Sequence, residues 1–308
     1  MRNRRTFIKK LGLFSLGTTL IPYQTFSQDN NLTKLTILHT NDMHSHIHPF
    51  SHGRNKGLGG MAERATMIKN IRKENQHILL LDAGDIFQGT PYFNLYAGEL
   101  ELKLMSKMKY DAATLGNHDF DNGLGGLKNQ LKHAKFPFLC ANYNFDQTIL
   151  KNKFKAFKIF RKGPLKIGVF GIGIELSGLV PKNLYEETIY KEPIQKANYY
   201  AKILKKDKKC DLVICLSHLG LKYNNQKVSD IKLAQQSKNI DLIIGGHTHT
   251  FLNKPLEEKN LDGENILINQ VGWGGINIGR IDFIFGRKKT KKAIFSNVIS
   301  IKNNEKTI

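Results

Sequence analysis

The chain has 308 residues, 40% of them hydrophobic and 24% charged, which is enough apolar material for a full core and excludes a disordered or fibrous protein. Its three cysteines are odd in number and lie in or beside apolar runs, so we expect three buried thiols instead of a disulfide framework. The net charge of +21 favours anionic partners such as phosphorylated substrates. The basic runs at 205–209 and 287–292 contain no aromatic residues for base stacking, so we expect solvated lysines and no nucleic-acid partner.

The first 27 residues have the pattern of an export signal. Arg4 and Arg5 resemble a twin-arginine signal, and they precede an apolar run at 11–21 that is well short of the roughly 20 residues needed to cross a bilayer. An ordinary secretory signal with two chance arginines is the alternative. We therefore expect a bacterial periplasmic protein, exported by the twin-arginine route, whose mature chain begins near Gln28 and has no transmembrane anchor.

Short apolar runs recur along the rest of the chain and predict buried strands. They lie at 35–39, 78–82, 112–116, 136–140, 166–173, 211–218 and 241–247. Segments with apolar residues spaced for one helix face separate several of them, at 61–75, 94–108, 126–135 and 192–206. From residue 264 onward the pattern indicates antiparallel strands joined by hairpin-like turns. Alternating strands and helices predict one α/β domain over residues 28–308.

Side chains that bind metals or transfer protons follow five of the predicted strands. They are Asp42, His44, Asp82, Asp85, Asn117, His118, Asp119, Asp121, His218, His247 and His249. Because strand ends in α/β sheets converge on one crevice, we expect a single cluster. Imidazole and carboxylate without thiolate suit zinc, manganese, iron, cobalt or similar divalent ions. These candidate ligands outnumber the roughly four to six that one ion binds, so we expect two metal ions.

Five of these motifs, in this order, resemble the signature of the calcineurin-like metallophosphoesterases. They read Asp42-x-His44, Gly84-Asp85, Gly116-Asn117-His118-Asp119, His218 and Gly246-His247-x-His249. The stretches LHTNDMH, DAGDIFQGTP, GNHDFDNG, FPFLCANY and GGHTHT are similar to the bacterial 5′-nucleotidase branch, and the resemblance covers residues 34–285. It implies the fold of the family, a four-layer αββα sandwich of two mixed β-sheets.

The resemblance also implies which residues hold the two metals. Asp42, His44 and His249 would hold the first, Asn117, His218 and His247 the second, and Asp85 would bridge them. Water bridging two dications becomes a hydroxide near neutral pH, and such a hydroxide can attack phosphorus in line.

His118 resembles the catalytic histidine of the family, which stabilises the transition state and assists the leaving oxygen. Asp121 matches the carboxylate that orients this imidazole, and Asp119 is the competing candidate. We prefer Asp121, because the side chain next to the histidine in sequence is expected to point elsewhere. We expect Asp82 to accept a hydrogen bond from a metal-ligating histidine. Trp273 either caps the substrate side or packs internally, and the sequence leaves both open.

Full-length 5′-nucleotidases carry a second, C-terminal domain that recognises the nucleoside, and this chain ends about where the catalytic domain of the family ends. We expect a phosphomonoesterase of nucleotide catabolism that acts on a small phosphorylated substrate, with a possible separate chain equivalent to that domain. The alternatives are a stand-alone phosphodiesterase for cyclic nucleotides or nucleotide sugars, a sulfur-ester hydrolase, and a non-enzymatic metal-binding or anion-binding subunit. The complete ligand set with His118 and Asp121 argues against the last.

Overall fold

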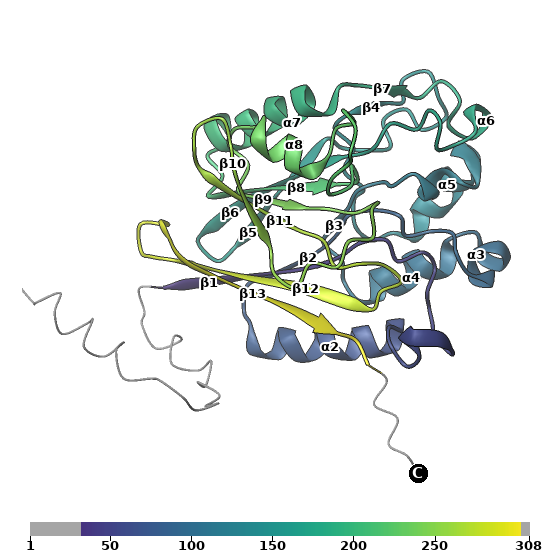
Figure 1. Cartoon of the computed structure of the whole chain (residues 1–308), viewed down its shortest axis with the longest axis horizontal. Helices are drawn as coiled ribbons and strands as arrows, with labels where there is room; N and C mark the ends of the chain where they lie inside the picture. Colours follow the sequence, from purple (N-terminus) through teal and green to yellow (C-terminus); the bar gives the residue numbers. More distant parts are fainter. Residues whose placement is uncertain (1–31, 303–308) are drawn as a thin grey trace, which may run out of the picture. The chain divides into compact units, whose positions relative to one another are not determined.

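The structure is a computed structural model that describes residues 32–302, so the predicted signal at 1–27 lies outside the described residues. Two large β-sheets form its centre (Figure 1). The first has the strand order β13-β12-β1-β2-β3. Its strands are β1 (Thr33–Thr40), β2 (Ile78–Asp82), β3 (Ala112–Ala113), β12 (Asn277–Phe285) and β13 (Lys291–Ser300).

The second sheet has the strand order β10-β11-β9-β8-β6-β5. Its strands are β5 (Phe157–Lys162), β6 (Leu165–Ile172), β8 (Leu212–Ser217), β9 (Leu242–Ile244), β10 (Leu256–Lys259) and β11 (Asn265–Asn269). A small ladder of β4 (Tyr143–Asn144) and β7 (Ile189–Tyr190) lies apart from both sheets. Strands β1, β2 and β3 run parallel, as do β6, β8, β9 and β11. Antiparallel pairing joins β12 and β13 to the first sheet, and β5 and β10 to the second. Both sheets are therefore mixed.

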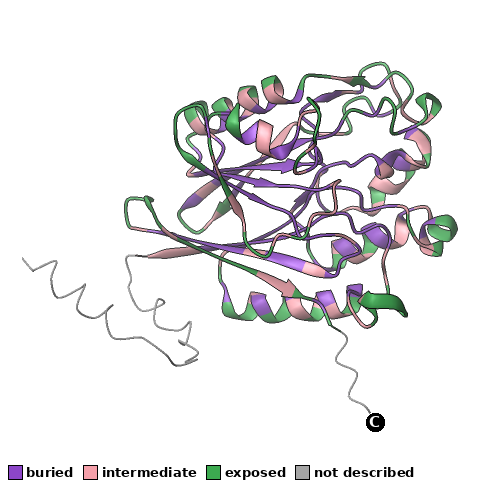
Figure 2. Cartoon of the chain, viewed as in Figure 1, coloured by how far each residue is buried: buried purple, intermediate pink, exposed green. Residues whose placement is uncertain are grey.

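Three apolar clusters divide the fold into four layers. Strand residues of both sheets, such as Leu79 and Ile214, form the cluster between the sheets. Alternate residues of the same strands, such as Leu80 and Val213, face outward into the two other clusters. Because side chains alternate along a strand, inner strands that are covered on both faces must be apolar throughout, and β2 and β8 are largely so. Figure 2 shows these buried strands between helices that are exposed on one side.

Helices cover the two outer faces and complete the αββα sandwich that the resemblance implies. On the first sheet lie α2 (Met61–Glu74), α4 (Glu99–Lys107) and α5 (Gly123–Gln130), and on the second lie α7 (Pro193–Lys202) and α8 (Asp230–Gln235). The shorter helices are α3 (Pro91–Tyr96), α6 (Lys182–Tyr185), η2 (Gly53–Asn55), η3 (His118–Phe120), η4 (Leu131–His133) and the π-helical turn η5 (Ile203–Asp207). None of the helices described is both long and apolar enough to cross a membrane.

Four predicted elements differ from the structure. In the antiparallel finish predicted from residue 264, β11 instead pairs in parallel with β9, and only β12 and β13 form the expected antiparallel pair. The strand predicted at 136–140 makes only isolated bridges, and the strand predicted at 112–116 has only two ladder residues, Ala112 and Ala113. The helix predicted over 94–108 is broken into α3 and α4 at Gly98, whose φ of 96° is left-handed and whose Cα packs against the Phe87 ring. The expected state of the cysteines is confirmed, since all three are buried and free.

Candidate metal centre

Loops that follow β1, β2, β3, β8 and β9 bring the predicted metal-binding side chains together. These loops begin where neighbouring parallel strands end, so their first residues meet at one edge of the sandwich. Asp42, Asp85 and His218 lie at the bottom of the cluster and are almost completely buried. His118 and His249 form its open side, with 37% and 39% of their side chains exposed.

Two groups of three side chains each have the spacing of a metal site. Asp42, His44 and His249 form one group, and Asp85, His218 and His247 form the other, with the ligand atoms of a group within 4.8 Å of one another. In the first group the Nε2 atoms of the two histidines are 2.9 Å apart.

The Asp85 carboxylate belongs to the second group and also faces the first. Its Oδ2 is 3.1 Å from His218 Nε2 in one group and 3.8 Å from His44 Nε2 in the other. Asn117 lies beside the second group, where its Oδ1 is 2.8 Å from His247 Nδ1. The structure thus brings together all seven residues that the resemblance implies as ligands.

Five of these residues have a left-handed backbone, which is uncommon for residues other than glycine. They are Asp42, His44, Asp85, His247 and His249, with φ between 46° and 73°. Such conformations persist only where surrounding contacts impose them, and they cluster at functional sites. Here the Asp42 carboxylate accepts hydrogen bonds from the His247 backbone N–H at 2.9 and 3.1 Å, which ties the first loop to the last.

His218 provides the sharpest test of whether a cation fits. Its Nδ1 is 2.7 Å from the Ala83 carbonyl oxygen and donates to it, so in the neutral ring Nε2 carries a lone pair. That Nε2 is buried, lacks a hydrogen-bond partner among the described residues, and faces the Asp85 carboxylate at 3.1 Å. Two acceptors at this distance require a positive charge between or beside them. The donor set therefore fits a bound metal ion.

The electrostatics of the cluster agree with this fit. Burial raises the pKa of Asp42 to about 8, and it lowers the pKa of His44 to about 4 and of His247 to about 3. These two imidazoles are therefore neutral, which is the form that binds metals. Burial alone would lower the pKa of His218, but the Asp85 and Asp42 carboxylates raise it to about 10. Without a metal ion the ring is therefore protonated, and the proton between Nε2 and Asp85 holds the place of the positive charge that a bound ion would supply.

His118 is paired with Asp121 on the exposed side of the centre. Its Nδ1 lies 2.8 Å from Asp121 Oδ2, and this hydrogen bond is the main cause of a raised pKa for His118. Its backbone N–H donates to Asp85 Oδ1 at 2.8 Å, which fixes the turn η3 against the carboxylate between the two groups. Gly116 is required just before this turn, because a Cβ there would overlap the Asp85 carboxylate.

Asp119, the competing candidate, points into the protein and serves a different role. Its carboxylate accepts four backbone hydrogen bonds, from Gly116 at 2.8 Å, Asp85 at 3.1 Å, Ile86 at 3.0 Å and Phe87 at 3.2 Å. It therefore clamps the loop after β2 to the loop after β3.

The expectation for Asp82 is wrong. Its carboxylate accepts hydrogen bonds from Thr40 Oγ1 at 2.6 Å and from the Gly84 backbone N–H at 2.9 Å, not from a histidine. The acceptor for the ligand histidine is instead the Ala83 carbonyl. Asp82 is the last residue of β2, so its side chain fastens the two strand ends below the cluster.

Trp273 lies over the metal cluster. Its ring is stacked on the His249 imidazole, with the centroids 5.8 Å apart and the planes at 12°. His46 and Phe50 contact its other sides edge-on, at 5.3 and 5.4 Å. The indole thus limits the movement of His249 and forms one wall beside the exposed histidines.

Gln270 is a supporting residue that sequence reasoning missed. Its amide donates to the Gly246 carbonyl at 2.7 Å, and its Oε1 accepts from Thr248 Oγ1 at 3.1 Å and from the Thr250 backbone N–H. The side chain therefore holds the loop that carries His247 and His249. A glutamine that directly follows an apolar strand was the only signal, and it has no metal chemistry of its own.

Residues 35–251 match the family described as calcineurin-like phosphoesterase. The chain is similar to the snake venom 5′-nucleotidase of Crotalus adamanteus, at 35% identity over 83% of this chain and 46% of the relative. It is also similar to the 5′-nucleotidase of Vibrio cholerae, at 34% identity over 87% of this chain and 52% of the relative.

A solved structure gives the same result in three dimensions. The 5′-nucleotidase precursor of Thermus thermophilus superposes with a TM-score of 0.79 at 30% identity, over 88% of this chain and 55% of that one. The chain spans about half the length of the curated relatives that it matches.

Proposed function

Since the chain belongs to the calcineurin-like phosphoesterase family, we propose that it hydrolyses phosphate esters at a centre of two divalent metal ions, with nucleotides as the substrate class. The observation that carries the proposal is the pair of three-residue groups, in which the Asp85 carboxylate of the second group also faces His44 of the first. A single-metal site would not need a second complete group.

This geometry supports the ligand assignment that the family resemblance implies. Asp42, His44 and His249 hold one ion, and Asn117, His218 and His247 hold the other, with Asp85 shared. Mixed imidazole, carboxylate and amide ligands suit zinc, manganese, iron, cobalt or a similar ion. Ions bound there supply positive charge for the phosphoryl oxygens and lower the pKa of water to near neutrality.

The side chain proposed to transfer the proton is that of His118. Hydrogen bonding to Asp121 raises the pKa of His118, which favours the protonated imidazole, the form that can donate from Nε2 to the leaving oxygen. The carboxylate also orients the ring, since it fixes Nδ1 at 2.8 Å. The exposed position of His118 leaves room for substrate beside it.

Nucleotides are proposed as substrates because the relatives are named 5′-nucleotidases. The matched region covers about half of each relative, and recognition of the nucleoside by a separate chain remains a proposal. A stand-alone phosphodiesterase or a sulfur-ester hydrolase is the alternative outcome.

The test compares two substrates with the purified, metal-loaded protein. Phosphate release from 5′-AMP and product release from a small aryl phosphodiester are measured in parallel, with His118→Ala as the control. Efficient AMP hydrolysis supports nucleotide recognition by this chain alone. Diester hydrolysis without AMP hydrolysis supports the alternative or a missing partner, and no hydrolysis of either contradicts the proposal.

Export is proposed separately, on the twin arginines Arg4 and Arg5. A double Arg4→Lys and Arg5→Lys variant should accumulate in the cytoplasm, whereas the unchanged chain should be recovered from the periplasm. Equal periplasmic amounts of both would refute the twin-arginine route.

A further inference from the structure

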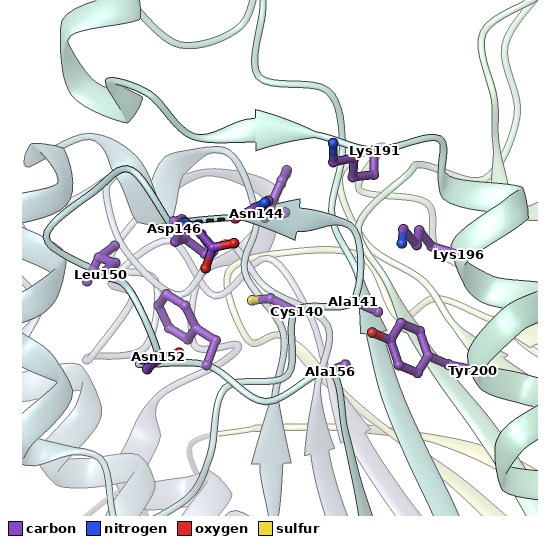
Figure 3. Close-up of a pocket in the computed structure, with 13 residues that line it drawn as sticks. Cys140, Ala141, Asn144, Asp146, Leu150, Asn152, Ala156, Lys191, Lys196 and Tyr200 are labelled. Carbon is purple, nitrogen blue, oxygen red and sulfur yellow. Dashed lines mark hydrogen bonds between the residues drawn. The ribbon is translucent and has the colours of Figure 1, made fainter.

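A cavity of about 330 Å³ lies outside the metal centre (Figure 3). The segment 140–156 forms one side of it, and the chain from Lys191 into α7 forms the other. None of its lining residues belongs to the two metal groups.

The charges of the cavity are separated. Lys191 and Lys196 lie on the side of α7, and neither ammonium group forms an ion pair or a hydrogen bond with another described residue. Figure 3 shows the Tyr200 hydroxyl on the same side and the Asp146 carboxylate across the cavity. Asp146 is held there because its backbone N–H donates to Asn144 Oδ1 at 2.7 Å. One end of the cavity therefore favours an anion, and the other favours hydrogen-bond donors.

The floor between these ends is apolar. It consists of Cys140 and Ala141, both buried, which Figure 3 shows between Asp146 and Tyr200. Burial raises the pKa of the Cys140 thiol far above its usual range, so the sulfur is uncharged. An uncharged floor between two polar ends fits a compact organic body that carries its anionic group at one end.

The cavity wall also contacts the turn that carries His118. Tyr143 and Phe145 line the cavity and pack on Phe120, with ring centroids 5.7 and 6.5 Å apart. Phe120 is fully buried and is the last residue of η3, the single turn that begins at His118. A ligand that moves either aromatic ring would therefore move the turn.

We propose that this cavity is a second ligand site, for a small phosphate ester with a hydroxyl-bearing body such as a sugar phosphate, and that its occupancy changes turnover through Phe120. The two ammonium groups of Lys191 and Lys196 match the double negative charge of a phosphate monoester, and sugar hydroxyls match Asp146 and Asn144. Binding does not require a hydrolytic metal centre, whereas the effect on turnover rests on the proposed function.

Calorimetric titration of the metal-loaded protein with the phosphonate isostere of ribose 5-phosphate tests the site, because this probe cannot be hydrolysed. Two classes of binding are expected, one at the metal centre and one in the cavity. The double variant Lys191→Ala and Lys196→Ala should lose one class, with at least a roughly tenfold weakening, at unchanged metal content. Lys202→Ala, an exposed lysine of the same helix, is the matched control and should keep both.

A single class in the unchanged protein, or identical isotherms for protein and double variant, would overturn the site. The effect on turnover is read from kcat in the presence of the isostere, since competition at the metal centre raises only KM. A change in kcat that disappears in the double variant supports the contact through Phe120. If two binding classes are seen but kcat does not change, the proposed effect on turnover through Phe120 is refuted, whereas the ligand site itself is supported.

Discussion

Replacing Asp119 by asparagine tests how the two loops below the metal cluster are held together. In the structure one carboxylate oxygen accepts from Ile86 and Phe87, and the other accepts from Asp85 and Gly116. An amide can keep only one of these oxygens. Whichever way it is oriented, two buried backbone N–H groups lose their acceptor and face an NH₂ group instead.

The expected cost follows from the number of donors left unpaired. A buried donor without a partner costs about 1–3 kcal/mol, so two of them cost about 2–6 kcal/mol. Part of this cost is offset by removal of the Asp119 charge. Burial and the nearby charge of Asp85 raise the pKa of Asp119 to about 7, so the ionised carboxylate is itself unfavourable at this position. We therefore expect the free energy of unfolding to fall by about 2–4 kcal/mol, a large share of the stability of an ordinary domain.

Urea unfolding followed by circular dichroism measures this difference, and Asp121→Asn is the matched control. Asp121 lies two residues away and is partly exposed, and its carboxylate contacts His118 at the surface, so its replacement should change the free energy of unfolding by less than about 1 kcal/mol. If both variants unfold at the same urea concentration, the assignment of Asp119 as the clamp between the loops is refuted.

Four further predictions concern the metal centre and its support. The His118→Ala variant should retain its metal ions, but its kcat should fall about 10²–10⁴-fold. The Asp85→Asn variant should lose metal and activity together. Equal metal loss in both variants would refute the role of His118. Asp121→Asn removes the main cause of the raised pKa of that imidazole, so the alkaline limb of the rate profile should move to lower pH, and an unmoved limb would count against the pair. Trp273 is the single tryptophan and stacks on a ligand histidine, so its fluorescence should change when a chelator strips the metal; constant emission would place the indole elsewhere. Gln270→Ala should weaken metal affinity about 10–100-fold in a competition titration, and an unchanged affinity would make the glutamine dispensable.

Much of the fold was readable from sequence because the inner strands are apolar on both faces. The runs at 35–39, 78–82 and 166–173 correspond to β1, β2 and β6 within a few residues. The run at 136–140 is equally apolar, yet it forms no ladder, because its burial comes from packing beside the first sheet with isolated bridges only. Hydrophobicity predicts that such a segment is buried, but pairing depends on neighbours that are distant in sequence.

The candidate site was predictable for the residues that carry metal chemistry and less so for those that support them. Histidines and carboxylates at strand ends are conspicuous, whereas Gln270 and the Ala83 carbonyl leave no chemical pattern in a sequence. The same limit explains the error at Asp82. A carboxylate near a ligand histidine suggests a hydrogen bond between the two. In the structure, however, the Asp82 oxygens accept hydrogen bonds from Thr40 Oγ1 and the Gly84 N–H.

Metal titration into stripped protein, with phosphate release from 5′-AMP measured at each step, tests the two-metal centre most directly. If the two groups around Asp85 each hold an ion, activity should be absent at the start and should reach its maximum at two equivalents per chain. Full activity at one equivalent, or hydrolysis by the stripped protein, would contradict the two-metal centre.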